Sequence, residues 1–380
     1  MDRFLRLDEA CNLNMGQSPE SNTYNEIQDG LPFFQGNADF GKIYPRARVW
    51  CTNPKKIVEK DTLLISVRAP IGALNFSSEK SCIGRGLAGI TAKNDFNLKY
   101  IYYCLKAKTK ELNAKGTGST FKAISKNALG ETQVKQISIQ KQMECVYILD
   151  SINKLVEYKK QQILNLDSLI KSRFAEIFGD KQNNKCSYPI YQLSNYIEFL
   201  TSGSRGWAKY CTNYGKEWFI TIKNVKNCHI AIGNMQSIDA PKNAEAARTR
   251  VQEGDLLVSI TADLGRTGVV TKEIANHGAY INQHLVCVRI KQNIVNPVYL
   301  AYFMESPAGK KQFISKNQSA VKAGLNFKSI NTLKVMIPPI DEQNRFADFV
   351  QQVDKLKSAV QKSLDETQIL FDALMQEYFG

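Results

Sequence analysis

The feature that most constrains this chain is a long segment that occurs twice. Residues 142–179 recur as residues 343–380, displaced by 201 positions, and matched places hold Gln142 and Gln343 at the start and Phe-Gly at the end. Self-similarity at so long an offset does not fit a solenoid of short repeats and indicates a duplicated protein. We therefore expect two related halves, each closed by one copy of this segment.

Both copies are predicted to be helices. Apolar residues fall at three- and four-residue spacing in the first copy (Leu149, Ile152, Val156, Ile163, Leu166, Ile170, Ile177) and at the same heptad positions in the second (Val350, Val353, Val360, Leu364, Phe371, Tyr378). Lys159, Lys357 and Thr367 interrupt the pattern. This spacing is typical of a coiled-coil seam, and neither copy contains proline or internal glycine. We predict two continuous helices packed antiparallel.

A second apolar column lies beside this seam. It consists of Ile148, Leu155 and Leu169 in the first copy and Phe349, Leu356 and Leu370 in the second. A helix pair buries one stripe per helix, so the second stripe must face something else. Either the globular segments cover it, or it is a docking surface for a separate protein.

Composition indicates the kind of partner. Lys and Arg total 50 against 36 Asp and Glu, which gives a net charge of +14 and favours nucleic acid first and an acidic membrane surface second. No apolar run is long enough to span a membrane, and the start has no signal-peptide core. Nine scattered cysteines suggest free thiols in a reducing cytoplasm, and only three histidines argue against a zinc site.

The chain divides into residues 1–140, a helix at 141–180, residues 181–340 and a helix at 341–380. The two globular segments match each other: residues 60–66 correspond to 253–259, 84–87 to 282–285, and 100–105 to 299–304. We predict an α+β protein with two homologous mixed α/β domains separated by two long antiparallel helices and related by a pseudo-two-fold axis. Residues 97–112 are predicted to be one helix inside the first domain.

This order resembles the specificity (S) subunit of type I restriction–modification systems over essentially the whole chain. The residues that carry the resemblance are Asp61-Thr62-Leu63-Leu64-Ile65-Ser66, Gly254-Asp255-Leu256-Leu257-Val258-Ser259 and Ile337-Pro338-Pro339-Ile340-Asp341-Glu342-Gln343. The last is close to the family's Pro-x-x-x-Gln pattern, whereas the first copy, residues 137–142, lacks the prolines and the Glu.

The resemblance implies a non-catalytic subunit with two target recognition domains that bind an asymmetric, bipartite site in double-stranded DNA. It also implies assembly with two methyltransferase subunits, which bind S-adenosylmethionine and methylate adenine, and with restriction subunits in systems that have them. Two homologous domains on antiparallel helices suit the two-fold symmetry of B-DNA, whose helical turn is about 34 Å. No cofactor, metal or membrane is expected for this chain itself.

Candidate DNA-binding residues are side chains suited to base edges or phosphates. Arg reads guanine, and Asn or Gln reads adenine. In the first domain they are Gln35, Arg46, Arg48, Arg68, Arg85, Lys115, Thr117, Ser119, Thr120 and Lys122. In the second they are Ser204, Arg205, Trp207, Lys223, Asn224, Arg266, Gln283, His284, Lys322 and Asn326. The competing interpretation is solvated surface residues, or side chains that hold their own loops.

The alternative function is a self-contained nucleic-acid-modifying enzyme with an unrecognised active site. Asn296-Pro297-Val298-Tyr299 superficially resembles the Asn-Pro-Pro-Tyr of adenine methyltransferases, but an Asn N-cap followed by Pro at the first helical position explains it. No glycine-rich cofactor loop or P-loop is present. We therefore predict no catalytic residues. Methyl transfer from S-adenosylmethionine by the chain alone would distinguish the two hypotheses.

Overall fold

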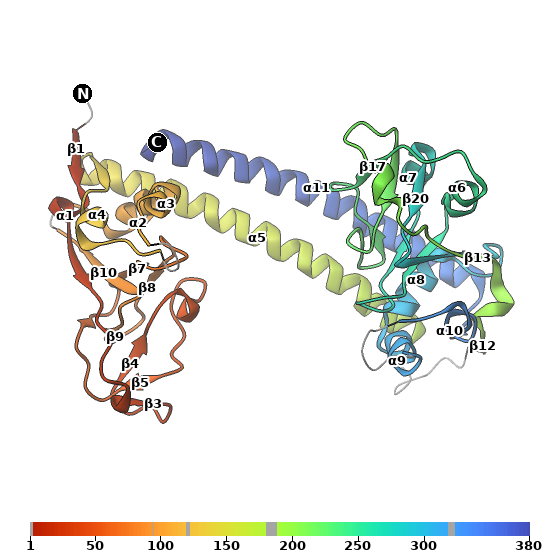
Figure 1. The fold of residues 1–380 in the computed structure, drawn as a ribbon, viewed down its shortest axis with the longest axis horizontal. Coiled ribbons are helices and arrows are strands. Elements are labelled where there is room, and N and C mark those ends of the chain that lie inside the picture. Colours follow the sequence, from red (N-terminus) through yellow and green to blue (C-terminus); the bar gives the residue numbers. More distant parts are fainter. Residues whose placement is uncertain (1–2, 94, 119–121, 180–187, 318–323) are drawn as a thin grey trace. The chain divides into compact units, whose positions relative to one another are not determined.

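The computed structural model describes residues 3–93, 95–118, 122–179, 188–317 and 324–380. The chain forms two compact units: unit 1 comprises residues 1–161 and 361–380, and unit 2 comprises residues 162–360. Figure 1 shows the elements of both. Each unit contains part of both long helices.

The long helices are α5 (Ile139–Phe178) and α11 (Ile340–Phe379), each of 40 residues. They begin three residues before the repeated Gln and end at the Phe before the final Gly. The predicted heptad seam is largely buried: Leu149 is 0% and Val353 is 3% exposed. The seam also continues through aromatic positions that the heptad pattern did not include, since Phe174 and Phe178 are buried as well.

Unit 1 is built on an antiparallel sheet with the strand order β2-β10-β7-β8. Its strands are β2 (Cys11–Met15), β10 (Leu87–Ala92), β7 (Leu63–Ser66) and β8 (Leu74–Phe76). A second sheet has the order β3-β5-β4-β9-β6, with β4 and β9 parallel. Its strands are β3 (Tyr24–Asn25), β5 (Trp50–Cys51), β4 (Leu31–Phe34), β9 (Ser81–Ile83) and β6 (Ile57–Val58).

Unit 2 repeats this topology with different details. Its main antiparallel sheet has the order β13-β21-β18-β19. The strands are β13 (Ile197–Ser202), β21 (Leu285–Ile290), β18 (Leu256–Ser259) and β19 (Thr267–Val269). The second sheet is smaller, with β17 (Gln236–Ile238), β14 (Glu217–Ile220) and β20 (Ala279–Ile281), and β14 is parallel to β20. The shared order confirms that the two halves have one fold.

A two-stranded ribbon precedes each long helix. In unit 1, β1 (Arg3–Arg6) pairs with β11 (Gln133–Gln136), and in unit 2, β12 (Ile190–Gln192) pairs with β22 (Lys334–Met336). Short helices complete each unit: α1 (Leu7–Ala10), α2 (Leu98–Ala107), α3 (Thr109–Ala114) and α4 (Lys126–Gly130) in unit 1, and α6 (Ala244–Thr249), α7 (Lys272–His277), α8 (Pro297–Glu305), α9 (Pro307–Ser315) and α10 (Phe327–Asn331) in unit 2.

The expected single helix over residues 97–112 is two helices, α2 and α3. Lys108 leaves helical geometry with φ −89° and ψ 10°. The Thr109 hydroxyl donates to the carbonyl oxygens of Lys106 and Leu105, at 2.9 and 3.3 Å. Thr109 thereby competes for the carbonyl groups at the end of α2, which is how threonine commonly interrupts or bends a helix. The expected cap at Asn296 is confirmed: its side chain accepts from the amides of Val298 and Tyr299.

Buried glutamines fix the start of each long helix. In unit 1, the Gln142 side chain is 0% exposed. Its Oε1 accepts from the backbone amide of Asn97, and its Nε2 donates to the backbone carbonyls of Asp95 and Ile137, all at 2.9 Å. This amide joins the helix start to the N-cap of α2. Because every buried donor and acceptor needs a partner, only a primary amide of this length satisfies all three backbone groups.

Gln343 repeats the arrangement in unit 2. Its Oε1 accepts from the backbone amide of Asn296 at 2.9 Å. Its Nε2 donates to the backbone carbonyls of Ile294 and Pro338 at 3.1 and 2.7 Å. The same geometry appears although residues 137–142 lack the prolines of the second copy. The missing prolines therefore do not change how the first helix is anchored.

Within unit 1, the N-terminal part of α5 runs antiparallel to the C-terminal part of α11. Lys159, one of the interruptions in the seam, donates to Ser363 Oγ at 2.8 Å and to Thr367 Oγ1 at 2.6 Å. The α2 helix packs on both long helices, and the Tyr103 hydroxyl donates to Asp150 Oδ1 at 2.7 Å. Lys159 and Thr367, two of the polar residues that interrupt the heptad pattern, are therefore hydrogen-bonded to each other.

Within unit 2, the C-terminal part of α5 pairs with the N-terminal part of α11 in the same sense. Lys357, the third interruption, forms an ion pair with Asp167. The rings of Phe174 and Phe346 lie 5.3 Å apart, and Phe178 lies 4.7 Å from Tyr299 of α8. Aromatic packing therefore joins both helix segments to α8.

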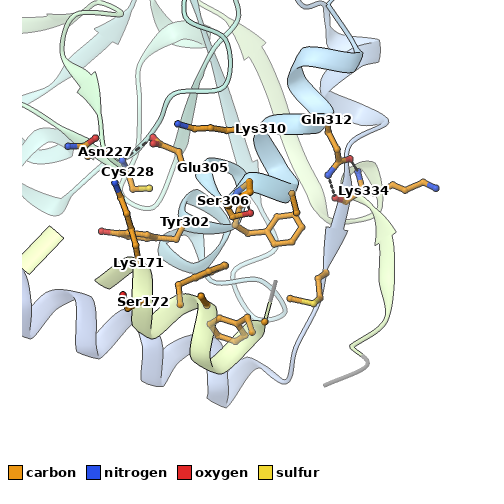
Figure 2. Close-up of a pocket in the computed structure, with 18 of the residues that line it drawn as sticks. Lys171, Ser172, Asn227, Cys228, Tyr302, Glu305, Ser306, Lys310, Gln312 and Lys334 are labelled. Atoms are coloured by element: carbon orange, nitrogen blue, oxygen red, sulfur yellow. Dashed lines mark hydrogen bonds between the residues drawn. The ribbon is translucent and has the colours of Figure 1, made fainter. Parts of the chain in front are cut away.

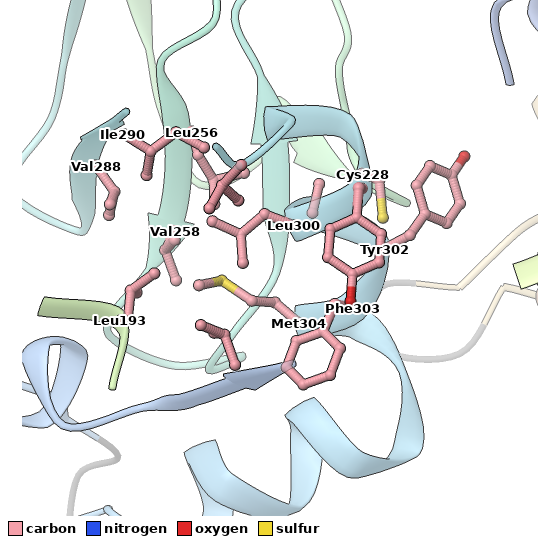
Figure 3. Packing of buried hydrophobic residues seen from close by; sticks show 14 of the residues in the cluster. Leu193, Cys228, Leu256, Val258, Val288, Ile290, Leu300, Tyr302, Phe303 and Met304 are labelled. Atoms are coloured by element: carbon pink, nitrogen blue, oxygen red, sulfur yellow. The ribbon is translucent and has the colours of Figure 1, made fainter. Parts of the chain in front are cut away.

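The core of unit 2 lies between its main sheet and α8. Figure 3 shows Val258 and Val288 of the sheet on the side that faces Leu300 and Met304 of α8. These side chains are at most 1% exposed. Burial of apolar surface contributes about 25 cal/mol per Å² to the free energy of folding. Such burial is therefore the main contribution that holds the main sheet of unit 2 against α8.

Candidate nucleic-acid interface

In unit 2 the loops that carry most of the predicted DNA-binding residues meet at one edge of the main sheet. The strand register places Ser202 opposite Val286, Leu285 opposite Ser259, and Val258 opposite Thr267. The loops at 203–206, 260–266 and 282–284 therefore leave the sheet side by side. A bridge between Thr261 and Gly324 adds the loop before α10 to the same edge.

Unit 1 has the equivalent edge. Ala88 pairs with Met15, Leu87 with Ser66, and Ile65 with Leu74, so the loops at 16–19, 67–73 and 84–86 leave the sheet together. A bridge between Arg68 and Ala123 brings in the loop after α3. The two edges correspond loop for loop, as the sequence match between the halves predicts.

Several of the predicted residues of unit 1 lie on this edge or in the loop that adjoins it. Arg68 and Arg85 are exposed, as are Thr117 and Lys122 in the adjoining loop. Lys115 is half-buried and forms an ion pair with Glu111 at 2.7 Å. Ser119 and Thr120 lie outside the described residues. Arg68 and Arg85 thus present guanidinium groups that no described side chain pairs.

Gln35, Arg46 and Arg48 are all bonded to one residue, Asp39, through its carboxylate or its backbone carbonyl. Asp39 is only 8% exposed, its Oδ2 accepts from the Gln35 amide at 2.8 Å, and its side chain forms an ion pair with Arg48. The Asp39 carbonyl accepts from the Arg46 amide at 2.8 Å. The three predicted residues therefore share one loop assembly, and part of the charge of Arg48 is already neutralised.

Seven of the ten predicted residues of unit 2 fall into two groups. Arg205 and Lys223 are exposed, and Gln283 and His284 are half-buried at the sheet edge. Ser204, Trp207 and Asn224 are buried, at 2%, 3% and 5% exposure. Their side chains bond or pack within unit 2: Ser204 Oγ lies 3.3 Å from Thr249 Oγ1, and Asn224 Oδ1 accepts from the Thr221 amide at 2.9 Å.

The remaining candidates of unit 2 hold their own loops. Arg266 forms an ion pair with Asp263 inside its loop, and Asn326 caps α10 by accepting from the Ser329 amide at 2.9 Å. Lys322 lies outside the described residues. Sequence reasoning missed Thr261, whose Oγ1 lies 2.8 Å from His284 Nδ1. The sequence match between the two halves could have indicated Thr261, because Thr261 aligns with the predicted residue Arg68.

The β15–β16 hairpin (Val225–Lys226 and His229–Ile230) is tied to α11 within unit 2. His229 Nε2 lies 2.7 Å from Asp354 Oδ2, and His229 Nδ1 lies 2.6 Å from the Asn227 carbonyl. Burial lowers the pKa of His229, but the hydrogen bond and charge of Asp354 outweigh it, so the pKa is raised overall. The protonated ring, with a proton on each nitrogen, satisfies both acceptors.

Unit 2 also contains a cavity of about 570 Å³ below α8. Figure 2 shows Lys171, Tyr302 and Lys310 among its lining residues, with the Cys228 amide donating to Glu305 Oε1 at 3.1 Å. Phe174 and Phe178 are among its apolar lining residues. Its lining includes none of the predicted DNA-binding residues, and it is separate from the sheet edge.

The second apolar column of the long helices is mostly open within each unit. In unit 1, Leu155 is 50%, Leu370 51% and Ile148 37% exposed; in unit 2, Leu356 is 57% and Leu169 47% exposed. Phe349 differs, because it is partly buried against the core of unit 2. The globular parts of each unit therefore leave most of this column uncovered.

Metal-ligating clusters and reactive thiols are two features of the described residues that bear on chemistry. No group of three or more His, Cys, Asp or Glu side chains there could hold a metal ion. Burial raises the pKa of the Cys11 and Cys104 thiols to about 12, so neither is a thiolate nucleophile near neutral pH. Within the same residues, no helix combines the length and hydrophobicity needed to cross a bilayer.

Comparison with known proteins identifies the class to which this fold and these edges belong. A family model described as "Type I restriction modification DNA specificity domain" matches residues 3–167 and 182–367. The chain therefore belongs to the family of type I restriction–modification DNA specificity domains, with one domain in each half.

Individual relatives agree with this assignment. A putative type I restriction enzyme MjaX specificity subunit from Methanocaldococcus jannaschii is 39% identical over 149 residues, which is 39% of this chain but only 35% of that subunit. The EcoBI specificity subunit from Escherichia coli is 20% identical over 403 residues, covering 96% of this chain and 82% of its own. The solved S subunit from M. genitalium has the same fold, with a TM-score of 0.61 at 14% identity over 100% of this chain and 96% of that one.

Proposed function

We propose that this chain selects the DNA sequence on which a type I restriction–modification complex acts. Each unit reads one short half of an asymmetric, bipartite target in double-stranded DNA, and the bases between the halves are unspecified. Methylation of adenine is carried out by two methyltransferase subunits, which bind S-adenosylmethionine, and cleavage by a restriction subunit where the system has one. The chain itself supplies recognition and no catalytic residue.

The observation that carries this proposal is the pair of equivalent sheet edges. Each edge gathers loops from distant parts of its half, and each presents exposed basic side chains, Arg68 and Arg85 in unit 1 and Arg205 in unit 2. Loops on a rigid sheet suit a surface that must vary while its scaffold stays fixed. The net charge of +14 supports a polyanionic partner, since Lys and Arg contacts to phosphates dominate DNA affinity.

The proposed partner surface is the apolar column on α5 and α11. Exposed leucines in a regular helical array bury apolar area when another protein covers them. Leu155 and Leu356 occupy matched positions of the duplication, 201 residues apart, and both are at least half exposed. Two matched positions support two copies of one partner, which agrees with two methyltransferase subunits.

The direct test is selection of DNA by the full-length chain, alone and with its methyltransferase subunits. Random-sequence duplexes are bound, recovered and sequenced at several salt concentrations. We expect two short sequence blocks with an unspecified spacer between them, and an affinity that falls steeply with salt because phosphate contacts release counterions. Recovery of no preferred sequence, or binding that does not respond to salt, would contradict the proposal.

The same protein preparation discriminates the alternative of a self-contained enzyme. The chain alone is incubated with its selected DNA and labelled S-adenosylmethionine. We expect methylated adenine only when the methyltransferase subunits are added. Transfer of label by the chain alone would establish the alternative and exclude a purely recognising role.

A further inference from the structure

One short turn at the sheet edge has the same backbone hydrogen bonds in both units but carries different side chains. We call residues 84–86 in unit 1 and residues 282–284 in unit 2 the edge turns. Each lies between a strand of the second sheet, β9 or β20, and the central strand of the main sheet, β10 or β21. Arg85 is the one exposed residue between Ser81 and Ile90. In unit 2, residues 282–284 are half-buried between the buried strands β20 and β21.

Backbone hydrogen bonds fix the edge turn of unit 1 on all sides. The Leu87 amide donates to the Gly84 carbonyl at 3.0 Å and closes the turn. The Gly84 amide donates to the Phe34 carbonyl at 2.8 Å, and the Val67 amide donates to the Gly86 carbonyl at 2.9 Å. These bonds hold the turn to the second sheet on one side and to the main sheet on the other.

The edge turn of unit 2 has the same bonds at the matched positions. The Leu285 amide donates to the Asn282 carbonyl at 3.0 Å. The Asn282 amide donates to the Ile220 carbonyl, and the Ile260 amide donates to the His284 carbonyl, both at 3.0 Å. The backbone of the turn is therefore the same construction in both units, although their sequences, Gly-Arg-Gly and Asn-Gln-His, share no residue.

A glycine packs against each edge turn and keeps it in place. A Cβ atom on Gly16 would lie 2.1 Å from the Gly84 carbonyl oxygen, and a Cβ on Gly203 would lie 2.1 Å from the Asn282 carbonyl oxygen. No side chain fits at either position without moving the turn. What differs between the units is therefore the side chain that a fixed turn displays.

The central residues of the two turns have different recognition chemistry. The Arg85 guanidinium has no hydrogen bond or ion pair with the described residues; only its backbone amide is engaged, with Ser18 Oγ at 3.4 Å. A free guanidinium presents paired donors that match O6 and N7 of guanine in the major groove. At the matched position of unit 2, the Gln283 carboxamide presents one donor and one acceptor. The donor matches N7 of adenine and the acceptor matches its N6 amino group.

The surroundings of Gln283 leave its amide incompletely bonded. Its Nε2 lies 3.3 Å from His284 Nε2, whereas its Oε1 is shielded from solvent and has no partner among the described residues. A buried polar atom without a partner costs free energy that a new partner recovers. Rotation of the amide outward onto an adenine would give both of its polar atoms partners.

We propose, on the basis of the function proposed above, that the edge turns determine which base each unit specifies at one position of its half-site. Arg85 reads a guanine in the half bound by unit 1. Gln283 reads an adenine in the half bound by unit 2. The turn sets the position of the reader in both units, and the identity of its central side chain sets the base.

The test exchanges the two readers in the full-length chain. Arg85→Gln and Gln283→Arg are each put through DNA selection as described above, with the methyltransferase subunits present. For Arg85→Gln we expect the preference for guanine at one position of one half-site to fall about 10- to 100-fold, with the other half-site unchanged. For Gln283→Arg we expect the preference for adenine at one position of the other half-site to fall by a similar factor.

Matched controls make the same changes of charge away from the edge. Arg3→Gln on β1 and Gln192→Arg on β12 alter exposed residues that precede the main sheet of each unit, at the end opposite to the edge turns. These controls are expected to leave both half-sites unchanged. Unaltered thermal unfolding of all four variants shows that a change of preference comes from the reader.

Two outcomes would overturn the inference. If Arg85→Gln weakens binding equally for every sequence and lowers the salt slope by about one, Arg85 contacts phosphate. If Gln283→Arg leaves the selected sequence unchanged, Gln283 is not a reader. Failure of the unaltered chain to select any sequence is a separate result, which removes the proposed function and this inference together.

Discussion

At the scale of the residue, the structure explains why a glutamine stands at the start of each copy of the long repeat. Gln142 and Gln343 are fully buried, and each bonds three backbone groups of its own unit. A glutamate lacks the donors and a leucine lacks all polar atoms. The repeated Gln is therefore a structural requirement of the junction between the helix and the domain.

Replacement of Gln343 by leucine is expected to destabilise unit 2. The substitution leaves the Asn296 amide and the Ile294 and Pro338 carbonyls without partners, at a cost of about 2–4 kcal/mol in the free energy of unfolding. Denaturant unfolding of the full chain measures the loss. Gln352→Leu, at an exposed position of the same helix, should change stability by less than about 0.5 kcal/mol. Equal stability of the two variants would show that the buried amide is dispensable.

At the scale of the element, the interruptions in the heptad pattern are specific contacts. Lys159 meets Ser363 and Thr367 in unit 1, and Lys357 meets Asp167 in unit 2. Polar groups in a seam commonly fix the register of paired helices, because a shifted register would bury them without partners. The breaks therefore define how α5 and α11 align within each unit.

The open apolar column on the long helices makes a prediction of its own. Leu155→Asp and Leu356→Asp together should weaken co-purification of the methyltransferase subunits while DNA binding by the chain is retained. Both side chains are at least half exposed, so the free chain should remain folded. Leu149→Asp, at a position with 0% exposure in the seam, is the control and should unfold unit 1. Unfolding by the Leu155 and Leu356 substitutions, or unchanged partner binding, would contradict a docking role.

At the scale of the whole molecule, the duplication separates two tasks. Each unit has its own core and its own sheet edge, and the topologies of the two main sheets correspond strand for strand. Variation at one edge need not disturb the other, because mutations in separate cores with no shared partners act independently.

Exchange of residues 1–140 for the corresponding segment of another specificity subunit tests this independence. We expect one half of the selected DNA sequence to change and the other half to stay the same. Sequencing of methylated adenines in cells that carry the chimaera and its partners reads both halves at once. A change in both halves would show that the two units do not read DNA separately.

Much of this organisation was predictable because it rests on periodicity. The repeat offset and the apolar spacing of residues 142–179 predict two long helices, and α5 and α11 are found there. The match between residues 84–87 and 282–285 predicts equivalent turns, and their backbone bonds are equivalent. The break between α2 and α3 was not predictable, because it depends on the Thr109 hydroxyl competing for carbonyl groups.

The candidate site was predictable as a set of loops and only partly as a set of side chains. Arg68, Arg85 and Arg205 are exposed as a reader requires, whereas Ser204, Trp207 and Asn224 are buried in unit 2. Composition cannot distinguish these cases, because burial depends on which strands lie next to each other in space. The partnership of Thr261 with His284 likewise joins residues far apart in the chain.

The sequence by itself determined the duplication, the two long helices and the family, since each follows from the order and spacing of residues along the chain. Only the tertiary structure decided which side chains a unit keeps for its own packing and which it presents at the sheet edge. The physical reason is that hydrogen bonding and burial depend on contacts between segments distant in sequence. Local pattern constrains the elements, and packing selects the residues that remain free to bind.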